Sequence, residues 1–183
     1  MDTQPKLFDI EPIRIPRPTL KTIDAVKALR KVAEEISDWE GDGYDVDVLA
    51  SELEDSIGID DFHRENGYTL AKALEKEFGY SPDLELVELM DGASWHIREA
   101  LKEDVKKWVK DCWIKPKHKI GDTVEVTFFN EKTGVSVSGE ITGIHEDTAE
   151  YLLYISSMRK DNTTAIVKNF EDIEKDFFKT KIE

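Results

Sequence analysis

The spacing of apolar residues changes once along the chain, at Pro116, and this change sets the fold class. Before Pro116 the apolar residues recur every three or four positions, as Ile97, Leu101 and Val105 do, which predicts amphipathic helices. After it the run HKIGDTVEVTFF alternates apolar and polar side chains, which predicts a half-buried strand. The sequence therefore predicts an α+β protein, with an N-terminal helical region of about four to five helices and a small antiparallel β-barrel behind it.

Composition and proline placement divide the chain further. Four prolines fall within the first 18 residues, and each removes a backbone donor and favours extended structure in the residue before it. We expect four segments: an extended arm (1–18), an acidic helical domain (19–115), a small antiparallel β-barrel (116–176) and a tail (177–183).

Capping residues predict where the helices begin and end. Gly79 is placed to cap a helix end, and the pair Ser81-Pro82 is typical of a helix start. Five helices are expected. The first starts at Thr19 or Thr22 and closes at Trp39, and the second runs from about Val46 to Gly58. The third carries Leu70 to Phe78, the fourth follows Ser81-Pro82 and reaches Met90, and the fifth carries Ile97 to Cys112.

The C-terminal region contains further strand candidates. NEKTG reads as a hairpin turn, VSVSGEITGI, AEYLLYI and TTAIVKNF predict strands, and NFEDIEK predicts a helical turn. Closing such short strands into a barrel removes exposed sheet edges. KIGDTVEV and GEITGI resemble the opening strand and the kinked second strand of SH3-like barrels such as Tudor and KOW modules, over Lys117 to Asp172.

Membrane and secretory signals are absent from the sequence given. It holds no run of 18 apolar residues and no charged start followed by an apolar stretch, so we expect a cytoplasmic protein without a membrane partner. Cys112 is the single cysteine, which excludes an internal disulfide and agrees with a reducing compartment.

Acidic residues outnumber basic ones by 40 to 25, and the excess is concentrated in one block. A net charge of −15 disfavours a general binder of nucleic acid or anionic membrane, since phosphate is neutralised by Lys and Arg. Direct nucleic-acid binding through the acidic region is not expected. The block contains twelve acids and no Lys or Arg: Glu34, Glu35, Asp38, Glu40, Asp42, Asp45, Asp47, Glu52, Glu54, Asp55, Asp60 and Asp61.

Part of this block resembles a calcium-binding loop. In DWEGDGYDVDVL the residues Asp38, Glu40 and Asp42 stand at the first, third and fifth places of an EF-hand loop. The twelfth place, where a bidentate carboxylate should close the site, is Leu49. A calcium site and a simple acidic turn between helices are the two alternatives, and no metal or cofactor is expected.

Catalytic patterns are sparse. The four histidines are scattered, and no GxSxG, Walker loop or Cys-His pairing occurs. His96, Glu99 and Glu103 could share a helix face and supply metal ligands, although the same set is typical of a solvated face. The sequence predicts a protein that is not an enzyme.

The acid block suggests a function that needs no catalysis. Duplex DNA displays one negative charge per about 1.7 Å of axis, and carboxylates at helical spacing can present a comparable line of charge to a basic groove. The first hypothesis is a nucleic-acid-mimicking inhibitor of a basic host protein, similar to the DNA mimics that phages and mobile elements use against restriction or CRISPR systems. The alternative is that the block serves solubility alone.

The N-terminal arm suggests a second hypothesis. In QPKLF the residues Gln4, Leu7 and Phe8 match the bacterial sliding-clamp-binding pentapeptide Gln-x-x-Leu-Phe. This resemblance implies a sliding clamp as partner, and hence a clamp-tethered replication or repair accessory factor whose barrel binds nucleic acid or protein. The competing interpretation is that Leu7 and Phe8 dock onto the protein's own helices.

Overall fold

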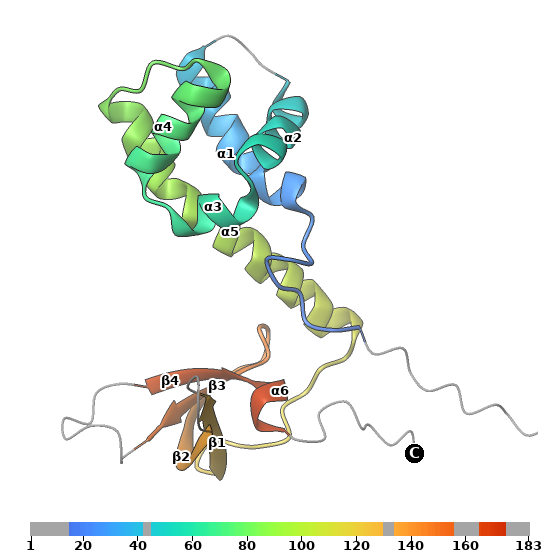
Figure 1. Cartoon of the computed structure of the whole chain (residues 1–183). Coiled ribbons are helices and arrows are strands. Elements are labelled where there is room, and N and C mark those ends of the chain that lie inside the picture. The colour runs from blue at the N-terminus through green and yellow to red at the C-terminus, as the bar shows by residue number, and fades with distance from the viewer. Residues whose placement is uncertain (1–14, 42–44, 130–133, 156–164, 175–183) are drawn as a thin grey trace, which may run out of the picture. The chain divides into compact units, whose positions relative to one another are not determined.

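The computed structural model describes residues 15–41, 45–129, 134–155 and 165–174 (Figure 1). Its backbone divides into two compact units. Residues 18–115 and 146–148 form one, here called the helical unit, and the other described residues form the sheet unit. The expected mixed architecture, with helices first and an antiparallel sheet after them, is confirmed.

The described residues of the helical unit form five helices, which Figure 1 labels. Two helix ends agree closely with the sequence, since Asp45 caps the start of the second helix and Gly79 ends the fourth in the left-handed conformation. The first helix begins later than expected, because Asp24 and not Thr19 or Thr22 caps it. The helices are α1 (Ala25–Glu40), α2 (Val46–Ser56), α3 (Ile59–Arg64), α4 (Gly67–Phe78) and α5 (Leu84–Asp111).

Two of the expected helices, the one after Ser81-Pro82 and the one that carries Ile97 to Cys112, form a single helix in the structure. The side chain of Asp83 accepts a hydrogen bond from the Leu86 N–H at 2.9 Å, so Asp83 starts α5 and Ser81-Pro82 lies before it. The helix then continues through Gly92 to Asp111. A single glycine costs a helix only about 1 kcal/mol, and packing along α5 outweighs that cost.

The core of the helical unit is formed by one apolar stripe from each helix. α1 packs against α2 and α5, and α5 also packs against α3 and α4. On α5 the stripe ends at Ile97, so only the first half of this helix lies in the common core. The largest fully buried side chains here are Leu29, Ile36, Leu49, Leu53, Phe62, Leu70, Leu74, Leu86, Met90 and Ile97.

At Gly67 the start of α4 lies very close to the backbone of α5. Its N–H donates to the Asp91 carboxylate, and a Cβ atom at this position would lie 2.2 Å from the Val87 carbonyl oxygen. A glycine is therefore required where the start of α4 meets α5.

We expect Gly67→Ala to lower the free energy of unfolding by about 1–3 kcal/mol, because the added methyl group must push the two helices apart. Gly92→Ala is the matched control. A Cβ at Gly92 meets no atom within 4 Å, so alanine there should raise stability by about 0.5–1 kcal/mol through helix propensity. Urea unfolding of both variants measures the difference, and equal stabilities would contradict this packing.

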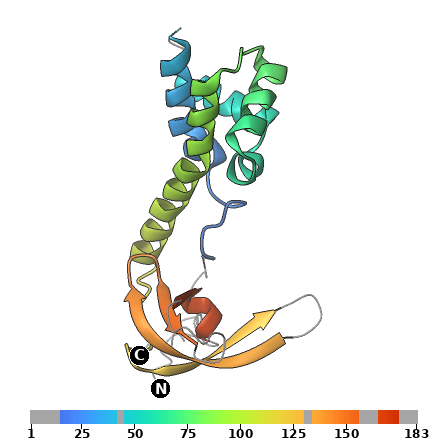
Figure 2. The same ribbon diagram turned by 90° about the vertical axis from the view of Figure 1, so that its left-hand side faces the viewer.

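In the sheet unit the described residues form four antiparallel strands, which lie side by side in the order in which they follow along the chain. All four strand predictions are confirmed, and the predicted final turn forms a short helix. The register between β2 and β3 shifts between Ile141 and Gly143, and Figure 2 shows β2 curving along the sheet. The elements are β1 (Thr123–Phe129), β2 (Gly134–His145), β3 (Glu150–Tyr154), β4 (Ala165–Asn169) and α6 (Phe170–Ile173).

The expectation of a closed barrel is wrong for the described residues. β1 and β4 are the two edges of the sheet and do not pair with each other. Instead α6 packs against both strands and places the fully buried ring of Phe170 beside that of Tyr151, with centroids 4.3 Å apart. Apolar contact through α6 takes the place of the hydrogen bonds that would close a barrel.

A buried polar cluster fixes the point where the chain enters the sheet unit. The Tyr151 hydroxyl donates to Glu174 Oε1 at 2.7 Å and accepts from the N–H groups of Lys117 and His118, both at 3.1 Å. Glu174 Oε1 also accepts from the Lys117 N–H at 3.0 Å. Burial raises the pKa of Tyr151, so the hydroxyl keeps the proton that it donates.

Arg17 fixes the described end of the predicted arm. Its guanidinium donates to the Ala149 carbonyl oxygen at 3.4 Å and to Glu171 at 3.3 Å, and it lies 3.7 Å from a Glu150 oxygen. Residues 15–17 therefore belong to the sheet unit.

Among the helices of the described residues, none combines the length and the apolar character that a membrane span needs.

Candidate protein-interaction surface

Eleven of the twelve predicted acids are described, and they lie on three consecutive helices. Glu34, Glu35, Asp38 and Glu40 lie on α1, the five from Asp45 to Asp55 lie on or cap α2, and Asp60 and Asp61 begin α3. Asp42 lies outside the described residues. We call these eleven residues the acidic surface.

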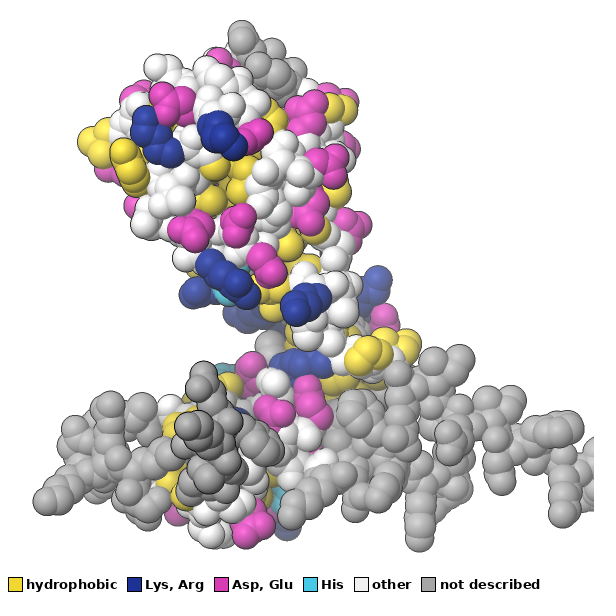
Figure 3. Space-filling view, in the orientation of Figure 1, with side chains coloured by type: hydrophobic (Ala, Val, Ile, Leu, Met, Phe, Trp, Pro, Cys, Tyr) yellow, Lys and Arg dark blue, Asp and Glu magenta, His cyan; other side chains and the backbone are white. Residues whose placement is uncertain are grey.

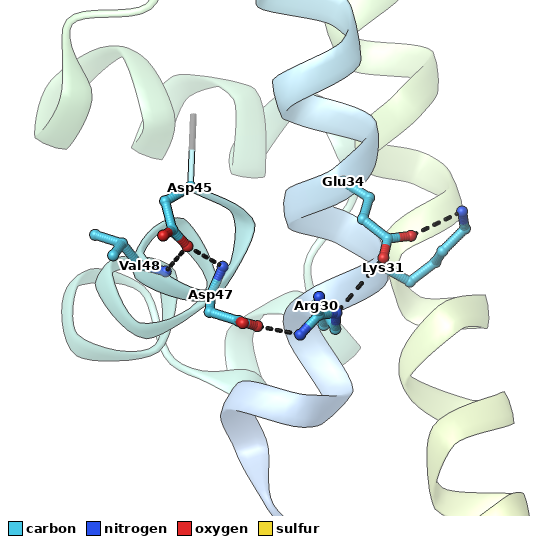
Figure 4. A network of polar contacts seen from close by, with 6 residues as sticks. All are labelled: Arg30, Lys31, Glu34, Asp45, Asp47 and Val48. Carbon is cyan, nitrogen blue, oxygen red and sulfur yellow. Dashed lines mark hydrogen bonds and ion pairs between the residues drawn. The ribbon is translucent and has the colours of Figure 1, made fainter. Parts of the chain in front are cut away.

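Two cations that precede the block partly neutralise it. Figure 4 shows Arg30 between two helices, with its guanidinium paired to Asp47 of α2 and, at 3.6 Å, to Glu34 of its own helix. Lys31 Nζ lies 3.1 Å from the other Glu34 oxygen. Because all of these side chains are largely exposed, the pairs contribute little stability and mainly position Asp47 and Glu34.

Two further acids satisfy backbone groups. Asp45 is the N-cap of α2 and accepts from the N–H groups of Asp47 and Val48 at 3.0 and 3.3 Å (Figure 4). Glu54 accepts from the Ile59 N–H at 2.8 Å, at the first residue of α3. Both carboxylates lie where helix N–H groups lack partners, and both therefore stabilise helix starts.

Glu35 joins α1 to α5. One of its oxygens lies 2.8 Å from His96 Nε2, and the His96 side chain is nearly buried. The metal set considered for His96 is not gathered, because Glu99 pairs with Lys102 and Glu103 pairs with Lys106.

The remaining acids form the open part of the acidic surface. In the part of the chain that the structure describes, no ion pair or hydrogen bond involves their side chains. Figure 3 shows acidic side chains gathered over the region of the helical unit where α2 lies. On α2 the exposed Val48 precedes two of them at helical spacing, four and seven residues on. We call these six the free acids: Asp38, Glu40, Glu52, Asp55, Asp60 and Asp61.

A shallow hollow of about 290 Å³ borders the acidic surface between α1 and α5. Glu35, Asp38 and Trp39 of α1 line it together with Glu85 and Leu89 of α5. No pattern in the sequence indicated Glu85, because its place beside α1 follows from the packing of two helices distant in the chain.

The calcium-loop resemblance falls partly outside the described residues. Asp38 and Glu40 lie in the last turn of α1, which Gly41 ends in the left-handed conformation, and Asp42 follows beyond it. Among described residues no three His, Cys, Asp or Glu side chains lie close enough to hold a metal ion. The clamp-motif residues Gln4, Leu7 and Phe8 also lie outside the described part.

Comparison of the chain with known protein families, with characterised proteins and with solved structures finds no match.

Removing the charge of Asp45 and removing that of Asp55 should change the free energy of unfolding in opposite directions. We expect Asp45→Ala to lower the free energy of unfolding by about 1 kcal/mol, because α2 loses its cap. Asp55→Asn should raise it by a few tenths, roughly 0.3 kcal/mol, since Asp55 lies in the last turn of α2, where a negative charge opposes the helix dipole. Thermal unfolding at low salt measures both, and a large loss in Asp55→Asn would mean that this acid is not free.

Proposed function

We propose that the protein is a non-enzymatic acidic interaction protein, of phage or mobile-element type, that occupies the nucleic-acid-binding surface of a basic host protein. The observation that carries the proposal is the set of six free acids on α1, α2 and α3, which have no cationic partner among the described residues. Restriction and CRISPR-type nucleases are the partner class that such a surface fits.

Mutual repulsion among these acids is the physical reason for proposing a basic partner. Like charges at helical spacing destabilise a helix by a few tenths of a kcal/mol per pair, about 0.2–0.5, and α2 has no basic residue in its last turn to offset them. A basic groove would remove this repulsion on binding, and many carboxylates would act together. Exposed charges are screened beyond about 8 Å at physiological salt, so binding should weaken strongly as salt rises.

The structure offers a matched pair of charge variants for testing this proposal. The first neutralises four free acids, as Glu52→Gln, Asp55→Asn, Asp60→Asn and Asp61→Asn. The second removes the same charge from four acids that already pair with neighbouring lysines, as Glu75→Gln, Glu77→Gln, Glu99→Gln and Glu103→Gln.

The measurement is displacement of labelled duplex DNA from a panel of restriction and CRISPR effector proteins. We expect the native protein to displace DNA from at least one member, the first variant to lose this activity, and the second to keep it within a factor of about two, because only free carboxylates are open to a groove. Equal loss in both variants would indicate a net-charge effect, and displacement by neither variant nor the native protein would refute the proposal.

The sliding clamp is the second candidate partner, and the motif Gln4, Leu7 and Phe8 supports it. We expect Leu7→Ala with Phe8→Ala to abolish binding to a bacterial sliding clamp in surface plasmon resonance. Burying the two side chains yields about 3–6 kcal/mol before the cost of ordering the arm, so both are needed. Lys6→Ala is the control and should bind as the native chain does. In this second function the four-stranded sheet unit would bind nucleic acid or protein.

A further inference from the structure

The second half of α5 and the segment after it carry a charge opposite to that of the rest of the chain. Within the helical unit, residues 106–115 (KKWVKDCWIK) hold four lysines but a single acid, Asp111. Figure 3 shows Lys and Arg side chains gathered on the helical unit beyond its acidic helices. This local positive charge is unused by the acidic surface and by the clamp motif.

A groove of about 830 Å³ lies at the end of α5 within the helical unit. Its apolar lining comes from Val109, Trp113 and Ile114, and the ammonium-bearing side chains of Lys110 and Lys115 lie along it. Its volume is within the usual range for small-molecule sites, about 300–1,000 Å³.

Trp113 is the most unusual residue of this groove. Its side chain is 83% exposed, and its backbone is left-handed, with φ at 53°. The Ile114 N–H donates to the Val109 carbonyl at 3.0 Å and the Trp113 N–H to the Lys110 carbonyl at 3.3 Å, so α5 ends in a Schellman motif. Glycine is the usual residue at this position of the motif. A tryptophan here bears backbone strain and leaves its indole in water, which points to a ligand for the indole face.

Lys110 and Lys115, which line the groove, and Lys107, which lies one turn before Lys110 on α5, are available to a ligand. Lys107, Lys110 and Lys115 are exposed and have no ion pair with any described residue, whereas Lys106 pairs with Glu103. Carboxylates are also present, since Asp111, Glu146 and Asp147 line the groove. A purely anionic ligand such as free phosphate would meet repulsion there.

We propose that this groove binds single-stranded nucleic acid. An unpaired base stacks on the Trp113 indole, and Lys107, Lys110 and Lys115 neutralise the flanking phosphates. The carboxylates of Glu146 and Asp147 accept hydrogen bonds from the amino groups of the stacked base, which phosphate cannot offer. A duplex keeps its bases stacked on one another and leaves the indole without a partner.

The test is fluorescence anisotropy of labelled 12-nucleotide single strands of DNA and RNA, with a duplex as comparison, at low salt. The full chain is compared with Trp113→Ala and with the triple variant Lys107→Gln, Lys110→Gln and Lys115→Gln. Trp95→Ala removes another exposed indole from α5, and Lys72→Gln, Lys76→Gln and Lys102→Gln remove three lysines that pair with glutamates. These two variants are the matched controls.

We expect the native chain to bind single strands more tightly than duplex. Trp113→Ala should weaken binding about 5- to 100-fold, as loss of one base–indole stack does. The lysine variant should reduce the steepness of log K against log salt by about 2, because three lysines no longer neutralise phosphates. Both controls should bind as the native chain does. Absence of binding, preference for duplex, or equal effects of Trp113→Ala and Trp95→Ala would overturn the proposal.

A second copy of the chain is the competing occupant of an exposed indole, and sedimentation velocity separates the cases. A concentration-dependent dimer that Trp113→Ala abolishes, without strand binding, would overturn the proposal. Trp113→Gly guards against misfolding as an explanation, since it removes the side chain while relieving the backbone. Failure of this site leaves the acidic-surface proposal untouched, because the two experiments change different residues.

Discussion

Burial of the apolar stripe of α1 is the constraint on which the charged surface depends. Leu29, Val32 and Ile36 are wholly buried, and α1 packs against both α2 and α5. Apolar burial of this kind contributes about 25 cal/mol per Å², far more than an exposed ion pair. The helical unit can therefore hold several unpaired carboxylates on its outside, because its stability does not come from its charges.

The acids of the block serve two different purposes, and their contacts separate them. Asp45 and Glu54 satisfy helix N–H groups, and Asp47 is held by Arg30. These residues keep α2 and α3 in place. Asp60 and Asp61 lie in the first turn of α3, where negative charge favours the helix dipole. The free acids of α1 and α2 have no such structural reason for their charge, since polar neutral residues would solvate the surface as well. That difference, more than the total charge, favours a cationic partner.

Periodicity and caps predicted most of the fold, and the failures have physical causes. Gly79 ended its helix as expected, and all four strands lie where alternation placed them. α3 was missed because six residues are too few to show a helical period. The sequence predicted two helices where α5 is one. Ser81-Pro82 resembles a helix start, although Asp83 is the N-cap of α5 and the helix continues to Asp111. The prediction of a closed barrel was wrong because β1 and β4 do not pair with each other, and α6 packs against both strands instead.

The candidate sites were less predictable, because they depend on contacts between distant residues. The positions of the acids were visible in sequence, but their division into paired and free depended on Arg30 and His96, which lie outside the block. Trp113 gave no sequence signal, since the left-handed position that it occupies at the end of α5 is one for which glycine is the usual residue.

One helix connects the acidic surface with the groove at Trp113. Glu85 and Leu89, in the first turns of α5, line the hollow beside the acids of α1, while Val109 and Lys110, in its last turn, line the groove at Trp113. A helix of 28 residues is about 42 Å long at 1.5 Å per residue. The 20 residues from Leu89 to Val109 span about 30 Å, which is several screening lengths at physiological salt, so the charge of Asp38 beside the hollow is largely screened at the groove. An acidic protein can in this way keep exposed lysines free for a ligand, because a rigid helix holds them away from the acidic surface.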